Sequence, residues 1–281
     1  MFYNTLKNEV NLLAIMEETQ HDINKKIVYL LEGLPGSKLV TEIFKREKIG
    51  ENIGDIVAEK ISKRKKEIFK EIQKAKVIDG VKELVNDLKS CGCLKAVVSG
   101  SSKEEIETIL DENIGTNNFD LVISGDDLKE GQGKPDPAPF QRALQKMNLK
   151  PSEALVVENS PLGVEAANKA GIPYIVTLNN SPLDISSDFG SLKLKEGEQN
   201  NRIFKDTKAA GYFLKDWCCK WKGNKIKKVN FETANWPNAF TSSESLRYFL
   251  SSFSIESVGS SLSTECFIFS SFACLFLALE S

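Results

Sequence analysis

Hydrophobic positions recur at helical spacing over the first quarter of the chain and in short continuous runs through its middle. Residues 5–76 are helical in pattern throughout. One helix there is marked by apolar residues four or seven positions apart: Ile53, Val57, Ile61, Ile68 and Ile72. The other face of that helix is basic, which is typical of a solvated helix face and also fits a rim that attracts anionic substrates. The pattern predicts an all-helical N-terminal segment.

The middle of the chain, residues 77–218, alternates short apolar runs with amphipathic segments. The runs are rich in Val, Ile and Leu with little alternation, which indicates strands covered on both faces. We expect strands at 94–98, 121–124, 154–157 and 174–177. Helices are expected to begin near Ser102, Ala138 and Pro161, and a closing helix is expected over 202–217. The alternation predicts right-handed crossovers and a parallel sheet, so the expected fold class is α/β.

The last part of the chain, residues 219–281, is rich in Ser and Phe and shows neither a helical nor a strand period. It includes an apolar run, residues 266–279, which at fourteen residues is shorter than the about twenty that a membrane span needs. We interpret this tail as foreign to the preceding fold and expect it to be disordered or poorly packed. A membrane-associating end is a less favoured alternative.

Composition adds general bounds. The chain has 281 residues, 41% of them hydrophobic and 27% charged, with a net charge of −2; this is typical of a soluble globular protein with one medium and one smaller domain. Near-neutral charge gives no reason to expect nucleic acid as a partner. The six cysteines favour free thiols in a reducing cytosol, and the single histidine leaves too few soft ligands for zinc. No signal-peptide pattern opens the chain, so we expect a cytoplasmic protein without a membrane partner.

Polar residues follow the predicted strands at the point where their carboxyl ends meet one edge of the sheet. Ser99 and Gly100 lie between the first core strand and a helix, so free backbone N–H groups and the positive end of that helix form a seat for an anion. Glu158 and Asn159 follow the third core strand, and Lys134 lies in a Gly-Lys-Pro turn. A cation and a carboxylate beside an anion seat favour phosphoryl chemistry.

Each of these residues also has an ordinary structural explanation. Ser99 could simply end a strand, Lys134 could be a surface residue beside a proline turn, and Glu158 could cap the helix that follows it. Because all of them occur in this order and beside the expected elements, the set favours descent from a phosphate-handling site.

In this order, the Ser-Gly-Ser loop, the Gly-Lys-Pro turn and the Glu-Asn pair resemble the second, third and fourth motifs of the haloacid dehalogenase superfamily, in its beta-phosphoglucomutase-like branch. The resemblance implies a Rossmann-like parallel sheet with a small helical cap. It places the cap at 1–76, the α/β core at 77–218 and a tail unrelated to the family at 219–281. It also implies phosphatase action on a small phosphorylated metabolite; a phosphomutase and a non-catalytic phosphate-binding module are the alternatives.

The resemblance gives each residue a role. Ser99, with the N–H of Gly100, would hold the phosphoryl oxygens, and Lys134 would neutralise charge on those oxygens and on the nucleophile. Glu158 would supply the acidic side chain that binds magnesium, a metal that takes oxygen ligands and usually only one or two carboxylates. Asn159 is neutral and would at best position a water on that metal.

The family's first motif, an Asp-x-Asp segment that supplies the nucleophile and the acid–base aspartate, does not occur in this sequence. Without a nucleophile the covalent route is closed, and a single carboxylate would bind magnesium weakly. We therefore expect the chain as written to be inactive, with its magnesium site weak or lost. No arginine occurs at residues 33–36, near where mutases of this branch carry one in the cap, so phosphatase ancestry is favoured over mutase ancestry.

The missing motif also removes the central strand of the sheet, between the strands at 94–98 and 154–157. Losing four or five buried apolar side chains forfeits roughly 6 to 15 kcal/mol, about the whole net stability of a typical domain. Either the flanking strands pair directly, another segment fills the gap, or the chain does not fold stably. The tail segments 267–269 and 275–277 are the least favoured candidates for a substitute strand.

Overall fold

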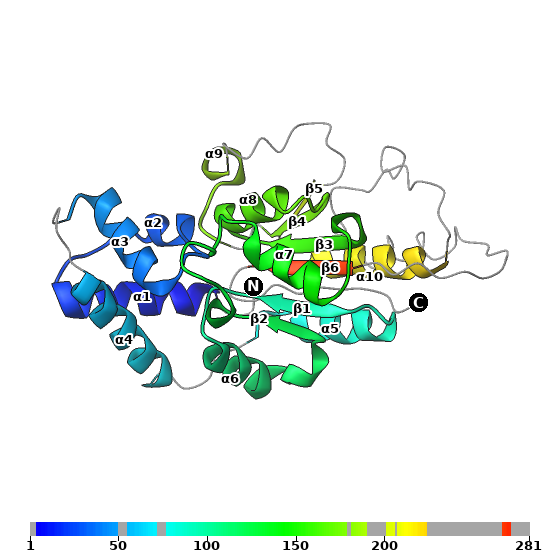
Figure 1. Cartoon of the computed structure of the whole chain (residues 1–281), viewed down its shortest axis with the longest axis horizontal. Helices are drawn as coiled ribbons and strands as arrows, with labels where there is room; N and C mark the ends of the chain where they lie inside the picture. Colours follow the sequence, from blue (N-terminus) through cyan, green and yellow to red (C-terminus); the bar gives the residue numbers. More distant parts are fainter. Residues whose placement is uncertain are drawn as a thin grey trace.

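The structure is a computed structural model. It describes these parts of the chain: residues 4–49, 55–71, 77–178, 181–189, 201–205, 207–223 and 266–270. Within them, a group of helices lies beside an α/β assembly built on one sheet (Figure 1). The predicted features at Ile53, Ile72 and residues 275–277 lie outside the described residues, as does most of the tail.

The N-terminal helices form the first group, drawn in blue in Figure 1: α1 Asn4–Thr19, α2 Lys25–Leu30, α3 Gly36–Glu47 and α4 Asp55–Glu71. Together with the loops between them they bury a hydrophobic cluster of their own. Ile61 and Ile68 on α4 are buried in this cluster, which confirms the predicted apolar face of that helix. The boundary predicted at residue 76 lies outside the described residues, so the extent of this domain stays a prediction.

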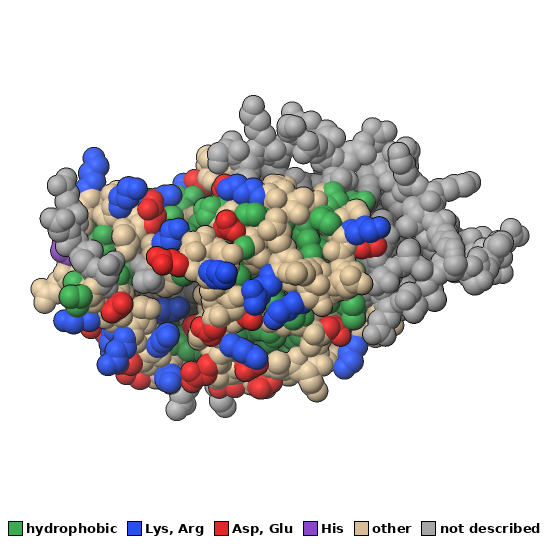
Figure 2. Space-filling view, in the orientation of Figure 1, with side chains coloured by type: hydrophobic (Ala, Val, Ile, Leu, Met, Phe, Trp, Pro, Cys, Tyr) green, Lys and Arg blue, Asp and Glu red, His purple; other side chains and the backbone are tan. Residues whose placement is uncertain are grey.

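Three residues of the basic face of α4 are paired with carboxylates: Arg64, Lys65 and Lys70. Arg64 Nε lies 2.6 Å from Glu17 Oε2 on α1, and Lys65 Nζ lies 3.6 Å from Glu105 Oε1 on α6, which spans Lys103–Asn113. On the face shown in Figure 2, basic and acidic side chains are interspersed over the described surface. Paired, mixed charge fits a solvated face better than a rim that attracts anions.

A six-stranded parallel sheet forms the second group. Its strands are β1 Lys95–Val98, β2 Leu121–Ile123, β3 Ala154–Glu158, β4 Tyr174–Leu178, β5 Asn201–Phe204 and β6 Cys266–Ser270. Their order across the sheet is β2-β1-β6-β3-β4-β5, and every neighbouring pair is parallel. The four strands predicted between residues 94 and 177 are confirmed as β1 to β4. All four residues of β1 and all five of β3 are buried, as their continuous apolar runs predict.

Helices flank the sheet in Figure 1. Besides α6 they are α5 Val81–Ser90, α7 Ala138–Lys146, α8 Pro161–Lys169, α9 Ile185–Asp188 and α10 Thr207–Gly223, with single 3₁₀ turns at Thr116–Asn118, Gly125–Asp127 and Pro151–Glu153. The closing helix predicted over 202–217 is wrong at its start, because Asn201–Phe204 pairs with β4 as an edge strand and α10 begins at Thr207. No helix in the described part of the chain is long and apolar enough to cross a membrane.

Serine caps fix where two of these helices begin. Ser102 Oγ accepts a hydrogen bond from the Glu105 N–H at 3.4 Å, and Ser160 Oγ accepts one from the Gly163 N–H at 3.1 Å. The predicted start of α6 after Ser102 is therefore confirmed. Because α6 follows β1 and α8 follows β3, both caps orient a helix N-terminus toward the carboxyl edge of the sheet.

The centre of the sheet is occupied by β6, a segment of the C-terminal tail. Its residues pair in parallel with β1 on one side, where Phe267 lies opposite Lys95, and with β3 on the other, where Cys266 lies opposite Ala154. Of the three outcomes left open for the missing strand, the structure shows another segment filling the gap, so the low rank given to residues 267–269 as a substitute strand is wrong. An open slot between two buried strands would leave two rows of unpaired N–H and C=O groups, which a short apolar segment without proline can satisfy.

A disulfide joins Cys93, just before β1, to Cys218 on α10, with the two Cα atoms 6.9 Å apart. Cys91 is disulfide-bonded as well. The expectation of free thiols is therefore wrong for these cysteines. Cys93 and Cys218 are 125 positions apart in the sequence, so no local pattern indicates the pairing, and the packing of α10 against α5 brings them together.

Proline at Ile268 tests whether β6 completes the sheet. Proline lacks the N–H that a central strand donates to the ladder, so Ile268→Pro should lower the free energy of unfolding by about 3 kcal/mol or more. Ile203→Pro on edge strand β5 is the matched control and should cost less, because β5 has one neighbouring strand. Urea denaturation followed by circular dichroism measures both. A small and equal effect of the two prolines would show that β6 does not hold this position.

Removing the Cys93–Cys218 disulfide should lower the free energy of unfolding by about 2–4 kcal/mol, because the bond restricts the unfolded chain over a long loop. Cys93→Ser and Cys218→Ser remove the same bond, so each should give this loss and the double variant should add little to it. Chemical denaturation under non-oxidising and oxidising conditions measures the difference. Fully additive losses from the two single variants would contradict the pairing.

Candidate active site

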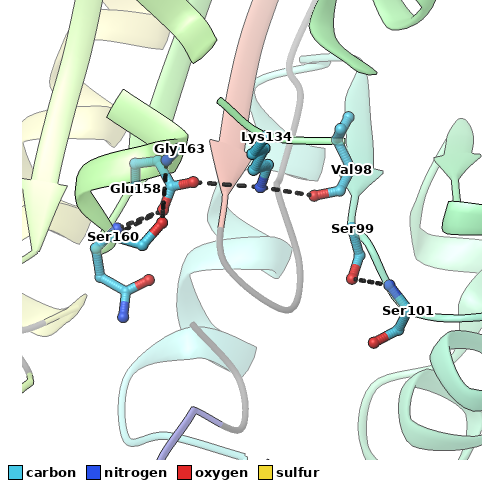
Figure 3. Close-up of polar contacts among 8 residues, drawn as sticks. Val98, Ser99, Ser101, Lys134, Glu158, Ser160 and Gly163 are labelled. Carbon is cyan, nitrogen blue, oxygen red and sulfur yellow. Dashed lines mark hydrogen bonds and ion pairs between the residues drawn. The ribbon is translucent and has the colours of Figure 1, made fainter. Parts of the chain in front are cut away.

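The carboxyl edge of the sheet brings together the lysine and the acid singled out from the sequence. Lys134 lies in the turn before α7 and Glu158 ends β3; Lys134 Nζ is 3.2 Å from Glu158 Oε1 and 3.4 Å from the backbone oxygen of Val98 (Figure 3). The exposed fractions of the two charged side chains are 2% and 0%. The buried lysine thus bridges the ends of β1 and β3, and Ser99 follows directly after Val98.

Glu158 uses both carboxylate oxygens. Besides the ion pair through Oε1, its Oε2 accepts hydrogen bonds from the N–H groups of Asn159 at 2.7 Å and Ser160 at 3.0 Å, and from Ser160 Oγ at 3.3 Å. These donors belong to the two residues just before α8, and the cap of that helix is Ser160, so Glu158 positions the capping residue and does not cap the helix itself. A Cβ at Gly163 would lie 1.3 Å from Glu158 Oε1, so only glycine leaves room for the carboxylate there.

The environment of Glu158 raises its pKa above the ordinary value for a glutamate. Burial is the main cause, since it disfavours the charged carboxylate. The positive charge of Lys134 and the two backbone N–H groups act in the opposite direction, while the carboxylate of Glu32 raises the pKa further by repulsion. Burial outweighs the ion pair, so Glu158 holds a proton more readily than an exposed glutamate does.

The Ser-Gly-Ser loop after β1 is closely packed. Ser99 is buried, and its Oγ accepts a hydrogen bond from the Ser101 N–H at 3.2 Å, which leaves the hydroxyl hydrogen available to a ligand (Figure 3). A Cβ at Gly100 would lie 3.1 Å from the carbonyl oxygen of Gly33, and a Cβ at Gly125 would lie 2.6 Å from the carbonyl oxygen of Gly100. Glycine at 100 and 125 allows this backbone to lie against its neighbours on both sides.

Asn159 is buried with an exposed fraction of 1%, and neither its Oδ1 nor its Nδ2 has a hydrogen-bond partner among the described residues. A buried amide without partners costs free energy, so such groups usually face a ligand or a water. The unsatisfied amide lies directly after Glu158 in the chain. It gives the site both a donor and an acceptor.

Residues of the helical group reach the site as well, and sequence reasoning missed their contribution. Gly33, between α2 and α3, has φ +109°, and a Cβ there would lie 3.1 Å from Lys134 Cδ. On the side of the sheet, Lys134 Nζ lies 5.4 Å from the centre of the ring of Phe140 on α7, which is a cation–π distance. The signal for Gly33 was present as Gly-Leu-Pro-Gly, a turn pattern, but nothing local to it indicates a lysine one hundred residues away.

The described residues do not by themselves fit a magnesium site. No group of three His, Cys, Asp or Glu side chains lies close enough to hold a metal ion in the part of the chain that the structure describes. Both oxygens of Glu158 are engaged with protein donors, and Asn159 offers one neutral oxygen. Magnesium takes six oxygen ligands, several of them usually waters, and here the protein offers it only an engaged carboxylate and one amide oxygen. The assignment of Glu158 and Asn159 as metal ligands stays a prediction.

The family model described as haloacid dehalogenase-like hydrolase matches residues 4–177, more than half of the chain. This chain belongs to that family. The match runs from α1 to β4 and so includes Ser99, Gly100, Lys134 and Glu158.

Among its relatives, a haloacid dehalogenase-like hydrolase domain-containing protein from Arabidopsis thaliana is 33% identical over 48% of this chain and 46% of the relative. Validoxylamine A 7'-phosphate phosphatase from Streptomyces hygroscopicus subsp. limoneus is 34% identical over 35% and 45% of the two chains. The phosphorylated carbohydrates phosphatase of Thermotoga maritima is 30% identical over 52% and 67%. The chain thus spans about half the length of the first two of these relatives.

Solved structures share the fold. A provisionally assigned beta-phosphoglucomutase from Bacteroides vulgatus is 27% identical with a TM-score of 0.63, covering 78% of this chain and 86% of that one. Beta-phosphoglucomutase from Clostridium difficile, at 17% identity and a TM-score of 0.61 over 78% and 93% of the two chains, shows a likeness of fold alone. The homologues of this chain include phosphatases and phosphomutases of small phosphorylated metabolites.

Removing the charge of Lys134 should destabilise the protein, because the buried Glu158 carboxylate then has no counter-charge. Lys134→Met leaves Glu158 without its counter-charge and should lower the free energy of unfolding by about 3–5 kcal/mol, whereas adding Glu158→Gln should restore a large part of the loss. The pKa of Glu158 is raised in the folded state, so its protonated form favours folding and this contribution is lost as pH rises through that pKa. Stability of Lys134→Met should therefore fall more steeply with pH than that of the double variant.

Urea denaturation between about pH 5 and pH 8 measures both effects. A double variant that is less stable than Lys134→Met at every pH would show that the two side chains do not compensate each other.

Proposed function

We propose that the carboxyl edge of this sheet binds the phosphoryl group of a small phosphorylated metabolite, as a site of phosphatase descent. The observation that carries the proposal is the buried Lys134 ammonium, held 3.2 Å from Glu158 and 3.4 Å from the Val98 carbonyl between the ends of two strands. The Lys134 ammonium is buried and held in place near the strand ends that α6 and α8 follow, and such a cation is suited to an anionic ligand.

Each residue has a task in this proposal. Lys134 donates to the phosphoryl oxygens, and the Ser99 hydroxyl and the N–H of Gly100 donate from the end of β1. Asn159, whose amide has no partner among the described residues, adds a further donor from the end of β3. Protonation of Glu158 would release the charge of Lys134 to the ligand, so we expect phosphate to bind together with a proton.

Binding without turnover is the expected behaviour of this chain. In-line attack on phosphorus through a covalent intermediate requires a nucleophilic carboxylate, and the sequence contains no Asp-x-Asp segment to supply it. The non-catalytic phosphate-binding module is therefore the form of the function that we favour. A mutase is less favoured, because residues 33–36 carry no arginine for a second phosphate.

Magnesium is proposed to bind weakly, because Glu158 is already occupied by Lys134 and by the α8 cap. The helical segment 1–76 is proposed as the cap, 77–218 as the core and 219–281 as an addition that contributes β6 to the sheet.

Nucleic acid is not proposed as a partner, since the net charge is −2. A cytoplasmic location remains a prediction, and the Cys93–Cys218 disulfide favours an oxidising compartment over a reducing one.

Thermal unfolding with inorganic phosphate or vanadate tests the proposal. Either anion should raise the melting temperature of the wild-type protein, and the gain should vanish in Lys134→Ala. Lys146→Ala is the matched control, because Lys146 is an exposed lysine on α7 and should leave the gain intact. Hydrolysis of p-nitrophenyl phosphate with magnesium should be absent. Turnover that Glu158→Ala abolishes would overturn the inactive assignment, and no response to either anion would overturn the binding function.

A further inference from the structure

A carboxylate from the helical group is buried beside the candidate site. Glu32, between α2 and α3, has an exposed fraction of 3%. Its Oε2 accepts one long hydrogen bond, 3.4 Å from Asn8 Nδ2 on α1, and its Oε1 has no partner among the described residues. Burying a carboxylate with so few donors is costly, because each unmet acceptor loses the water it would otherwise bind.

Contacts of the next residue in the chain, Gly33, place the Glu32 carboxylate near the phosphate site. The following residue, Gly33, lies against the side chain of Lys134, and its carbonyl oxygen lies against Gly100. Burial is the main cause of the raised pKa of Glu158, and repulsion by the charge of Glu32 adds a smaller contribution in the same direction. Glu32 therefore lies near Lys134 and Glu158, on the side of the helical group.

Asn11 extends the same polar cluster. It lies three positions after Asn8 on α1, so the two amides share a face of that helix. Asn11 has an exposed fraction of 5%, and its Nδ2 has no partner among the described residues. Glu32, Asn8 and Asn11 thus place a negatively charged acceptor and amide groups inside an otherwise apolar group of helices.

We propose that Glu32, with Asn8 and Asn11, selects the part of the substrate that carries the phosphate, and that it accepts hydrogen bonds from hydroxyl or amino groups there. The proposal rests on the phosphate site put forward above and adds the substrate class: a monophosphate whose organic part is rich in hydrogen-bond donors. An amino group should be favoured most, because a charge-assisted hydrogen bond to a carboxylate is stronger than a neutral one. A second phosphate should be rejected, because it would face the charge of Glu32 in a poorly screened interior.

A purely structural role for the cluster makes a different prediction. If Glu32 only holds α1 against the loop before α3, neutralising it would change stability and would affect all ligands alike. If Glu32 contacts the ligand, neutralising it changes the order of affinities and leaves inorganic phosphate unaffected. The ranking of ligands therefore separates the two roles.

Isothermal titration calorimetry of the full chain provides the test, with four probes: inorganic phosphate, glucosamine 6-phosphate, glucose 6-phosphate and fructose 1,6-bisphosphate. In the wild-type protein, glucosamine 6-phosphate should bind most tightly of the three sugar phosphates and the bisphosphate least tightly. In Glu32→Gln, affinity for glucosamine 6-phosphate should fall by about tenfold or more and affinity for the bisphosphate should rise, while that for inorganic phosphate stays within about twofold.

Glu59→Gln, an exposed acid on α4, is the matched control and should leave all four affinities unchanged. Should Glu32→Gln fail to fold, Glu32→Asp keeps the charge on a shorter side chain; it should still reject the bisphosphate and should bind glucosamine 6-phosphate less tightly than the wild-type protein. Sugar-phosphate affinities that do not depend on residue 32, with phosphate still bound, would overturn this inference alone. Absence of phosphate binding in the wild-type protein would instead overturn the function on which it rests.

Discussion

Lys134 and Glu158 are both buried, and each charge is tolerable at this depth only because the other is present. The pair also links the two sides of the sheet edge across β6, since Lys134 bonds to the end of β1 as well as to the end of β3. Glu158 in turn accepts a hydrogen bond from Ser160, the residue that caps α8. One ion pair therefore links the ends of two strands to the residue that caps a helix, and this arrangement makes the site suitable for an anion.

Sequence reasoning recovered much of this arrangement because its signals are local. Continuous runs of Val, Ile and Leu identified β1 and β3, and two of the residues expected at this sheet edge, Lys134 and Glu158, are in contact. Lys134 was found through its turn, and the contact with Glu158 followed from the rule that parallel strands end at one edge. The family supplied the roles, but the convergence itself could be inferred from strand ends and helix starts.

The features that were missed all depend on contacts between distant parts of the chain. Glu32 looks like an ordinary polar residue after an apolar helix, and only the packing of Gly33 on Lys134 places it beside the site. Cys93 and Cys218 are separated by 125 residues and carry no spacing signal. The strand β6 was ranked low because its run is short and its surroundings lack a period; what makes it a strand is the pair of unsatisfied edges on β1 and β3 that it joins.

The position of β6 has a consequence for how this protein is made. The strand that lies at the centre of the sheet is the last one along the part of the chain that the structure describes, so β1 and β3 have no neighbour between them until residue 270 has been synthesised. Both are hydrophobic strands with open edges during that interval, which is the condition under which nascent chains associate with one another. Closing the sheet also joins residues about 170 positions apart, which favours slow folding. The nascent chain should therefore need chaperones until β6 has been synthesised and has paired with β1 and β3.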